Sequence, residues 1–227
     1  MIYAMSDLHG CYDKYIKMLE KINYSDNDTL YILGDVVDRG NDGIKILLDL
    51  MSRKNVVVLR GNHDFVAHKL LYSSVFPENI TDFDAIAEDF MLWFKDGGEI
   101  TFKQFQKLPE SEKISLLKFI NSLLIYEEID VGENSFFLSH TIPTKEKMLD
   151  FESCKWQDFI IGEPEYDKRY FTDKFIVTGH IPTGLISKQH TGRIYRNNNH
   201  IAIDCGAVFG NPLGCICLDN FKEFYIH

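Results

Sequence analysis

The sequence of 227 residues contains no apolar run long enough to cross a membrane, and it has no excess of positive charge. Lysine and arginine number 24 against 34 aspartates and glutamates, which gives a formal net charge of −10. A protein that binds nucleic acid mainly through the phosphate backbone needs the opposite balance. We therefore expect no nucleic-acid partner and no membrane partner. Bound cations could still reverse the charge locally, so a phosphorylated substrate is compatible with this composition.

Cysteine is sparse, and no second cysteine pair accompanies the pair near the C-terminus. The five cysteines are Cys11, Cys154, Cys205, Cys215 and Cys217. The last two have strand spacing, so both side chains should lie on one face. A structural zinc site is not favoured, and we expect free thiols in a reducing cytoplasm. The N-terminus leads directly into an expected strand rather than a signal peptide, which also favours a cytoplasmic protein.

Two common catalytic motifs are missing as well. The chain has no phosphate-binding loop of the G-x-x-x-x-G-K type and no G-x-S-x-G nucleophile elbow. Kinase chemistry and serine-esterase chemistry are therefore not expected.

The first third of the chain alternates between strand and helix patterns. Apolar segments at residues 2–8, 29–34 and 55–61 predict strands, and helical spacing of apolar residues predicts helices at 12–22 and 43–51. This βαβαβ order predicts parallel strands joined by right-handed crossovers. The segment at 55–61 contains a continuous apolar run, VVVL, which predicts a strand buried on both faces.

From about residue 65 to residue 125 the patterns predict helices without clear strands. Residues 82–94 and 111–126 have helical periodicity, with Ser111 as a possible N-cap. We expect the large side chains of this region to pack in a core rather than to bind substrate; they are Phe90, Met91, Trp93, Phe94, Phe102 and Phe105. The last third returns to strands, which we expect at residues 135–140, 174–180, 200–206, 214–219 and 222–227. We expect a single α/β domain over residues 1–227 with a helical insertion at about 65–125.

Polar side chains follow the ends of five expected strands. They are Asp7 and His9; Asp35, Asp38 and Arg39; Arg60, Asn62, His63 and Asp64; His140; and His180. Each alone is more often part of a capped turn or satisfied by one hydrogen bond. In an open parallel sheet, however, functional groups gather beyond the carboxyl ends of the strands, and the flanking glycines allow close approach. The combination predicts a binuclear metal site.

Four segments carry a family resemblance. SDLHG, GDVVDRG, RGNHD and TGHIPT, in this order, resemble the phosphoprotein-phosphatase branch of the calcineurin-like metallophosphoesterases. The C-terminal IAIDCGAVFGNPLGCICLD is similar to the bacterial members, which include serine/threonine protein phosphatases and symmetrical dinucleoside tetraphosphatases. These segments bracket nearly the whole chain, and only the helical insertion lacks such a mark. The resemblance implies an α/β fold of four layers, an α/β/β/α sandwich, with a helical insertion.

The resemblance also implies a ligand set. One metal ion would be held by Asp7 and His9, the second by Asn62, His140 and His180, and both by Asp35. A carboxylate can bridge two cations because it has two oxygens. Mixed imidazole and carboxylate ligands favour manganese, with iron or zinc as alternatives, over calcium or magnesium. Two such divalent ions would lower the pKa of a bound water enough to supply hydroxide near neutral pH.

Three further residues would complete the catalytic machinery that the resemblance implies. His63 would give a proton to the leaving group, and Asp38 would orient its imidazole. Arg39 would bind the phosphate with its planar guanidinium, and Asn62 would also contact the substrate.

Three positions depart from the family pattern. Ser6 stands where glycine is usual, and the segment SHTIP replaces the usual His-Ala-Gly around His140. Relatives usually carry a second phosphate-binding arginine where this chain has Glu163; Arg169 lies nearby in the sequence and is the candidate replacement. An acid at position 163 would repel a phosphate dianion.

The sequence therefore favours a hydrolase of phosphomonoesters, in first place a serine/threonine protein phosphatase. A dinucleoside tetraphosphate hydrolase is the alternative, although the sequence has no obvious cluster of basic residues that could bind a polyphosphate chain. A third possibility is a weakly active metal-binding module that recognises phosphorylated partners; the intact His63 and Asp38 argue against it. The expected partner is a phosphorylated protein or a nucleotide.

Overall fold

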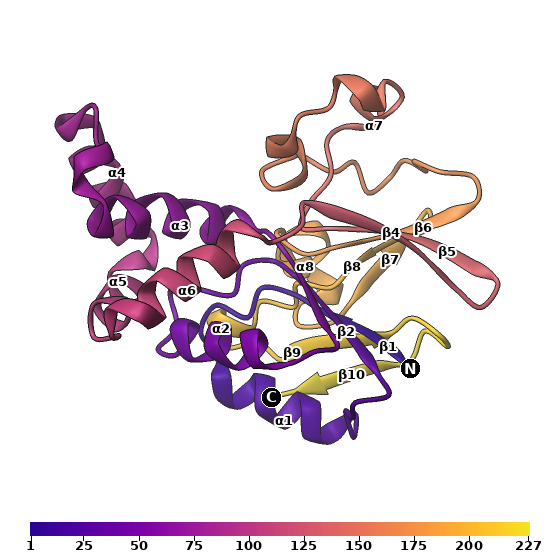
Figure 1. Ribbon diagram of the computed structural model, residues 1–227. Helices are drawn as coiled ribbons and strands as arrows, with labels where there is room; N and C mark the ends of the chain where they lie inside the picture. Colours follow the sequence, from indigo (N-terminus) through magenta and orange to yellow (C-terminus); the bar gives the residue numbers. More distant parts are fainter.

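Two five-stranded β-sheets form the centre of the molecule in the computed structural model, which describes residues 1–227 (Figure 1). The strands are β1 (Ile2–Met5), β2 (Thr29–Leu33), β3 (Val56–Leu59), β4 (Tyr126–Val131), β5 (Asn134–Ser139), β6 (Lys174–Thr178), β7 (Tyr195–Asn197), β8 (His200–Ala202), β9 (Leu213–Cys217) and β10 (Glu223–Ile226). The helices are α1 (Tyr12–Lys21), α2 (Gly43–Ser52), α3 (Asn62–Val75), α4 (Phe83–Trp93), α5 (Glu99–Gln106), α6 (Glu110–Asn121), α7 (Lys145–Met148) and α8 (Thr183–Ile186).

The first sheet has the order β10-β9-β1-β2-β3, and the second has the order β4-β5-β6-β8-β7. β1, β2 and β3 pair in parallel, as the βαβαβ pattern predicts, so their carboxyl ends meet at one edge. β9 and β10 continue this sheet with antiparallel pairing. The expectation that residues 55–61 are buried on both faces is wrong for Val56 and Val57, which are partly exposed because β3 is the last strand of its sheet.

The layers follow from the alternation of side chains along each strand. In β1, Tyr3 and Met5 enter the core shared with the flanking helices, whereas Ala4 enters a second core between the two sheets. In β5, Phe136 enters the core between the sheets, whereas Phe137 enters a third core on the outer face of the second sheet. This third core is covered by α7 and short 3₁₀ turns. The expected α/β fold is confirmed, with helices, two sheets and a thin outer layer.

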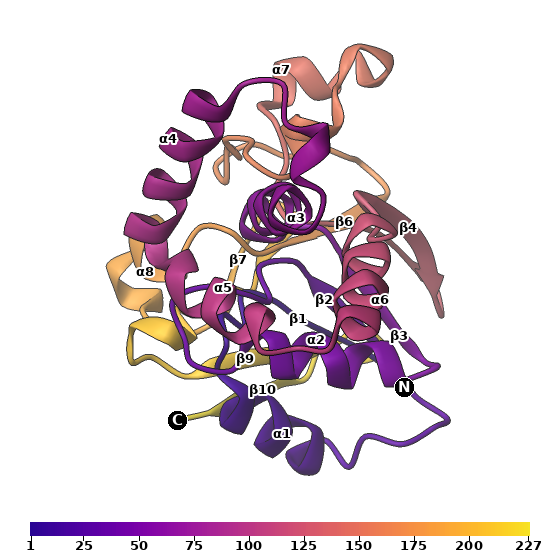
Figure 2. The ribbon, with the colours of Figure 1, turned by 60° about the vertical axis from the view of Figure 1, so that its left-hand side comes forward.

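The helical insertion comprises α3 to α6 (Figure 2). Its aromatic side chains pack together as expected, with Phe90, Phe94 and Phe102 within 5.7 Å of one another by ring centroids. Met91 is an exception and is 66% exposed on α4. The expected N-cap at Ser111 is also wrong, because α6 begins one residue earlier, directly after Pro109.

The strands of the last third are confirmed, but β4 and β7 are additions that the sequence patterns did not predict. Cys215 and Cys217 lie on one face of β9 in the same core, as their spacing predicts. All five cysteines are free thiols. None of the helices has both the length and the apolar composition of a membrane-spanning segment.

Candidate metal centre and active site

The loops that follow the strands bring the predicted site residues together in strained backbone conformations. Ten residues other than glycine have a positive φ, and six of them are predicted site residues: Asp7, His9, Asp35, Asp38, Arg39 and His180. Such conformations are uncommon for residues with a side chain and persist only where the surroundings enforce them. Their concentration in these loops indicates a candidate functional centre.

Two glycines allow these loops to approach one another. A Cβ on Gly61 would lie 2.1 Å from Asp35 Oδ1, and a Cβ on Gly34, whose φ is +84°, would lie 2.6 Å from the Gly61 nitrogen. Neither position can hold a larger residue without moving the loops. The glycines in GDVVDRG and RGNHD are therefore needed to place Asp35.

Asp35 is shared between two groups of potential metal ligands. Its Oδ1 accepts a hydrogen bond from the His63 backbone N–H at 2.9 Å. Its Oδ2 lies 3.6 Å from His9 Nε2 and 3.5 Å from His140 Nε2. The groups His9–Asp35–His63 and Asp35–His140–His180 each have their donor atoms within 4.8 Å of one another. One buried carboxylate thus stands between two sets of imidazoles.

The group Asp35–His140–His180 presents acceptor atoms that could ligate a cation. His140 donates from Nδ1 to the Leu33 carbonyl at 2.7 Å, which leaves the lone pair on Nε2. That atom lies 3.0 Å from Asn62 Oδ1 and 3.1 Å from His180 Nδ1. Two imidazole nitrogens and an amide oxygen therefore converge on one point, and such a donor set can ligate a divalent metal ion.

The first group is similar. His9 donates from Nδ1 to the Val37 carbonyl at 2.8 Å, so its Nε2 lone pair faces the site. Asp7 is also buried and accepts hydrogen bonds from the His180 backbone N–H at 3.0 and 3.2 Å. Asp7 belongs to neither of the two groups of donors that lie within 4.8 Å of one another.

The pKa values in the site also fit a bound cation. Burial raises the pKa of Asp7 and Asp35 well above the usual range, and repulsion from Asp204 and Asp64, respectively, raises them further. Burial lowers the pKa of His9 well below its usual value, and that of His180 to about 4. Neutral imidazoles are the form that binds metal, and a cation would offset the cost of buried carboxylates. The residues present fit divalent metal ions.

The helical insertion holds the predicted acid and its partner in place. His63 Nδ1 lies 2.8 Å from Asp38 Oδ2. Trp93 Nε1 donates to the same oxygen at 2.7 Å, and the Thr101 hydroxyl donates to Asp38 Oδ1 at 2.7 Å. Thr101 also accepts from the Asp38 backbone N–H at 2.9 Å. Asp38 is fully buried and paired on both oxygens, so the direction of the His63 ring is well defined.

Arg39 reaches across the mouth of the site. Its two Nη atoms lie 2.8 Å from His9 Nε2 and 2.8 Å from His63 Nε2. Its guanidinium carbon lies 5.5 Å from the centre of the Phe209 ring. A metal ion on His9 would replace the first of these hydrogen bonds and leave the guanidinium free to contact a phosphate.

Glu163 and Arg169, in the segment that departs from the family pattern, make none of these contacts. Glu163 is exposed and makes no hydrogen bond or ion pair. Arg169 is exposed and donates to the carbonyls of Phe171 and Thr172 in its own loop. The structure does not bring Arg169 into contact with the predicted metal ligands.

The sequence patterns predicted no role for three residues that support the site: Trp93, Thr101 and Asp64. Trp93 and Thr101 lie far from Asp38 in sequence, and no motif links them. Asp64 was noted only as part of RGNHD, yet its carboxylate accepts from the backbone N–H groups of Asp35, Val36 and Gly61 at 2.8–3.0 Å. An acid three residues after an N-cap, here Gly61, is a capping signal that could have indicated this role.

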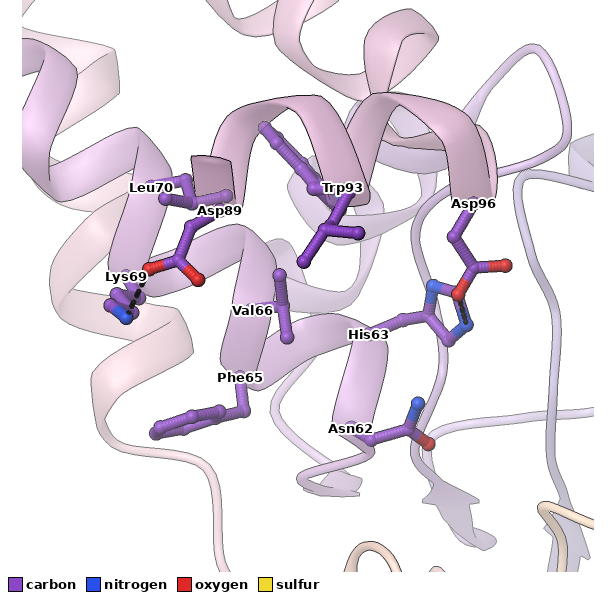
Figure 3. Close-up of a pocket in the computed structure, with 10 residues that line it drawn as sticks. Asn62, His63, Phe65, Val66, Lys69, Leu70, Asp89, Trp93 and Asp96 are labelled. Atoms are coloured by element: carbon purple, nitrogen blue, oxygen red, sulfur yellow. Dashed lines mark hydrogen bonds and ion pairs between the residues drawn. The ribbon is translucent and has the colours of Figure 1, made fainter. Parts of the chain in front are cut away.

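A groove of about 270 Å³ opens beside His63, between α3 and α4. Figure 3 shows Asn62, His63 and Asp96 at one end and the Lys69–Asp89 ion pair toward the other. Its walls are mostly apolar and comprise Phe65, Val66, Leu70, Leu92 and Trp93.

A family model covers most of the chain. The model for the calcineurin-like phosphoesterases matches residues 1–206. A bis(5'-nucleosyl)-tetraphosphatase PrpE, asymmetrical, from Geobacillus sp. (strain WCH70) is 26% identical over 93% of this chain and 88% of its own length. A symmetrical bis(5'-nucleosyl)-tetraphosphatase from Wigglesworthia glossinidia brevipalpis is 36% identical over a shorter stretch, 38% of this chain and 31% of that protein.

Solved structures show the same fold. The structure titled a putative diadenosine tetraphosphatase matches 99% of this chain and 92% of its own, with a TM-score of 0.62 and 16% identity. A protein serine/threonine phosphatase from Saccharomyces cerevisiae matches 94% of this chain and 71% of its own, with a TM-score of 0.57 and 13% identity. At these identities the likeness extends to the fold alone.

Proposed function

The chain belongs to the calcineurin-like phosphoesterases and is a metal-dependent phosphoric ester hydrolase; within this class we propose that it cleaves a phosphoanhydride bond of dinucleoside polyphosphates. The relative that matches almost the whole chain carries the name of a dinucleoside tetraphosphatase. The five free thiols are consistent with a cytoplasmic enzyme.

The proposed metal ligands comprise four residues of the two groups around Asp35, with Asp7 and Asn62 added and His63 kept as the acid. Asp7 and His9 would hold one ion, and Asn62, His140 and His180 the other, with Asp35 between them. Two divalent ions of manganese, iron or zinc, when bound, activate water and neutralise charge on the phosphoryl oxygens.

The remaining chemistry belongs to the side chains at the mouth of the site. His63 would protonate the leaving oxygen from Nε2. Its Nδ1 would stay hydrogen-bonded to Asp38, whose carboxylate would stabilise the positive charge of the imidazolium. Arg39 would donate two N–H groups to the phosphoryl oxygens as charge develops on them.

The groove beside His63 is the observation that carries the choice of substrate. In an in-line displacement the leaving group departs on the side of the acid, which here is the side of the groove. An anhydride of a dinucleoside polyphosphate leaves as a nucleotide, whose flat base suits the apolar walls formed by Phe65, Val66 and Leu92. A phosphoserine leaving group has no such flat apolar part.

A protein phosphatase is the second candidate. It is favoured by the fully paired Asp38–His63 couple, because the alkoxide of serine is a poor leaving group that depends strongly on a general acid.

The test compares kcat/KM of the manganese-loaded protein on diadenosine tetraphosphate, a phosphoserine peptide and an aryl phosphate. We expect the dinucleotide to be preferred over the peptide by about tenfold or more, a difference of about 1.4 kcal/mol. Preference for the peptide would contradict the proposal and establish the second candidate.

Two exposed neighbours on α4 provide a matched pair of variants. Leu92 is 67% exposed and lines the groove, whereas Met91 is 66% exposed and does not. Leu92→Ala should raise KM for diadenosine tetraphosphate by about fivefold, because a partly buried contact of about 1 kcal/mol is lost. Leu92→Ala should leave the KM for the aryl phosphate unchanged. Met91→Ala should change the KM of neither substrate. Equal effects of the two variants would argue against a base in the groove.

A further inference from the structure

The carboxylate of Asp96 contacts Arg39, the side chain that would bind a phosphate. Asp96 Oδ1 is 3.2 Å from Arg39 Nη2, and Asp96 Oδ2 is 3.5 Å from His63 Nε2. Figure 3 shows the Asp96 carboxylate pointing at the His63 ring. No other carboxylate forms an ion pair with Arg39.

The position of Asp96 is fixed by the backbone around it. Asp96 belongs to a π-helical turn, Phe94–Gly98, between α4 and α5. The next residue, Gly97, has a φ of +97° and accepts a hydrogen bond from the Arg39 backbone N–H at 3.0 Å. A Cβ on Gly97 would lie 2.8 Å from Arg39 Cγ, so the turn is packed directly against Arg39. Turns of this type inside helices are frequent at functional sites.

The guanidinium that Asp96 contacts is also held from its other sides. His9 and His63 accept from its two Nη atoms, and Phe209 lies against its face. The Asp96 carboxylate therefore takes, at Nη2, a direction from which a phosphate in the active site could approach Arg39. Its side chain is 61% exposed, so it can move away without leaving a buried charge unpaired.

We propose that Asp96 is an internal competitor for the substrate phosphate: its carboxylate occupies the phosphate position on Arg39, and a phosphate ligand must displace it. Every phosphate ligand meets the same repulsion from this carboxylate. A ligand with further contacts, such as a nucleotide in the groove, can offset that repulsion, whereas inorganic phosphate cannot. Asp96 thus weakens binding of the phosphate product and of small phosphomonoesters, which have no further contacts to offset the repulsion.

The inference rests on the proposed function only in that the ligand contains a phosphate. It does not depend on which phosphate ester or anhydride is the substrate. Inorganic phosphate is therefore the appropriate probe, because it is common to all candidates.

The experiment compares the wild-type protein with Asp96→Asn and with the control Glu88→Gln. Glu88 is an exposed acid on α4 that makes no ion pair, so the control removes one negative charge from the insertion without touching Arg39. Two quantities are measured on the manganese-loaded protein: the inhibition constant of inorganic phosphate against aryl phosphate hydrolysis, and the shift of Tm as phosphate is added.

We expect Asp96→Asn to bind phosphate about three- to tenfold more tightly by both measurements, with tenfold equal to about 1.4 kcal/mol. Glu88→Gln should stay within about twofold of the wild type, as expected for a distant, screened charge. Unchanged or weaker phosphate binding by Asp96→Asn would overturn the proposal and show that Asp96 serves to orient Arg39. The Tm titration gives this answer even if diadenosine tetraphosphate proves not to be the substrate, so the two proposals can fail separately.

Discussion

Replacement of Thr101 by valine tests whether the helical insertion supports the acid of the active site. Thr101 is 1% exposed, and its hydroxyl forms two hydrogen bonds with Asp38, one as donor to Oδ1 and one as acceptor from the backbone N–H. Valine has nearly the same shape but can form neither bond. The variant therefore removes the interaction while keeping the packing.

The expected loss follows from the two bonds. A hydrogen bond to a charged acceptor contributes about 1.5–3 kcal/mol, and a buried N–H left without a partner costs about 1–3 kcal/mol. Allowing for the favourable burial of the added methyl group, about 0.8 kcal/mol, we expect Thr101→Val to lower the free energy of unfolding by about 2–4 kcal/mol. For a chain of this length that corresponds to a fall in Tm of roughly 5–15 °C.

The matched control is Thr183→Val. Thr183 is also buried, but its hydroxyl donates only to the neutral carbonyl of His190 at 2.9 Å. Its loss should cost about 1 kcal/mol. Urea unfolding of both variants provides the measurement. If Thr101→Val costs no more than Thr183→Val, the Asp38 network does not stabilise the fold as the distances imply.

Three other predictions concern the acid, the metals and the buried His200 of β8. His63→Asn should keep its metal content but lose about 10²–10⁴-fold in turnover of alkyl phosphates, and less for an aryl phosphate, whose leaving group needs less protonation; equal losses on both would show that His63 is not the acid. Removal of divalent ions with a chelator should lower Tm by roughly 5–10 °C, as for a ligand at about 100 times its Kd, and added Mn²⁺ should restore it; an unchanged Tm would argue against a metal-linked fold. Burial lowers the pKa of His200 to about 3, against about 6.5 when unfolded, so its contribution to stability is complete above pH 6.5 and is lost as the pH falls toward 3. The free energy of unfolding should therefore fall by about 2 kcal/mol more between pH 7 and pH 5 in the wild type than in His200→Gln, and equal falls would refute this assignment.

The sequence was most informative where local pattern and topology agree. The three parallel strands of the first sheet are each a short apolar segment that ends in glycine and polar residues, so both the strands and their common edge could be predicted. The same logic predicted the meeting of His9, Asp35, His140 and His180, although these residues span most of the chain.

The parts that could not be predicted depend on contacts between distant segments. β4 alternates exposed and partly buried residues and pairs with β5 in a hairpin, and its sequence carries no continuous apolar run. The contacts of Trp93 and Thr101 with Asp38 arise because the insertion folds back over the first sheet, and no local pattern encodes that return. The role of Asp96 could not be predicted either, because it depends on a contact with Arg39, which lies 57 positions earlier in the chain.

The metal content of Asp35→Asn tests the account most directly. Asp35 Oδ2 lies between the two groups of imidazoles, and an asparagine amide cannot bridge two cations as an anion. Elemental analysis should find two divalent ions per chain in the wild-type protein, and Asp35→Asn should lose both ions together with the hydrolysis of every phosphate substrate. Two retained ions with full activity in Asp35→Asn would contradict the assignment of Asp35 as the residue that holds the centre together.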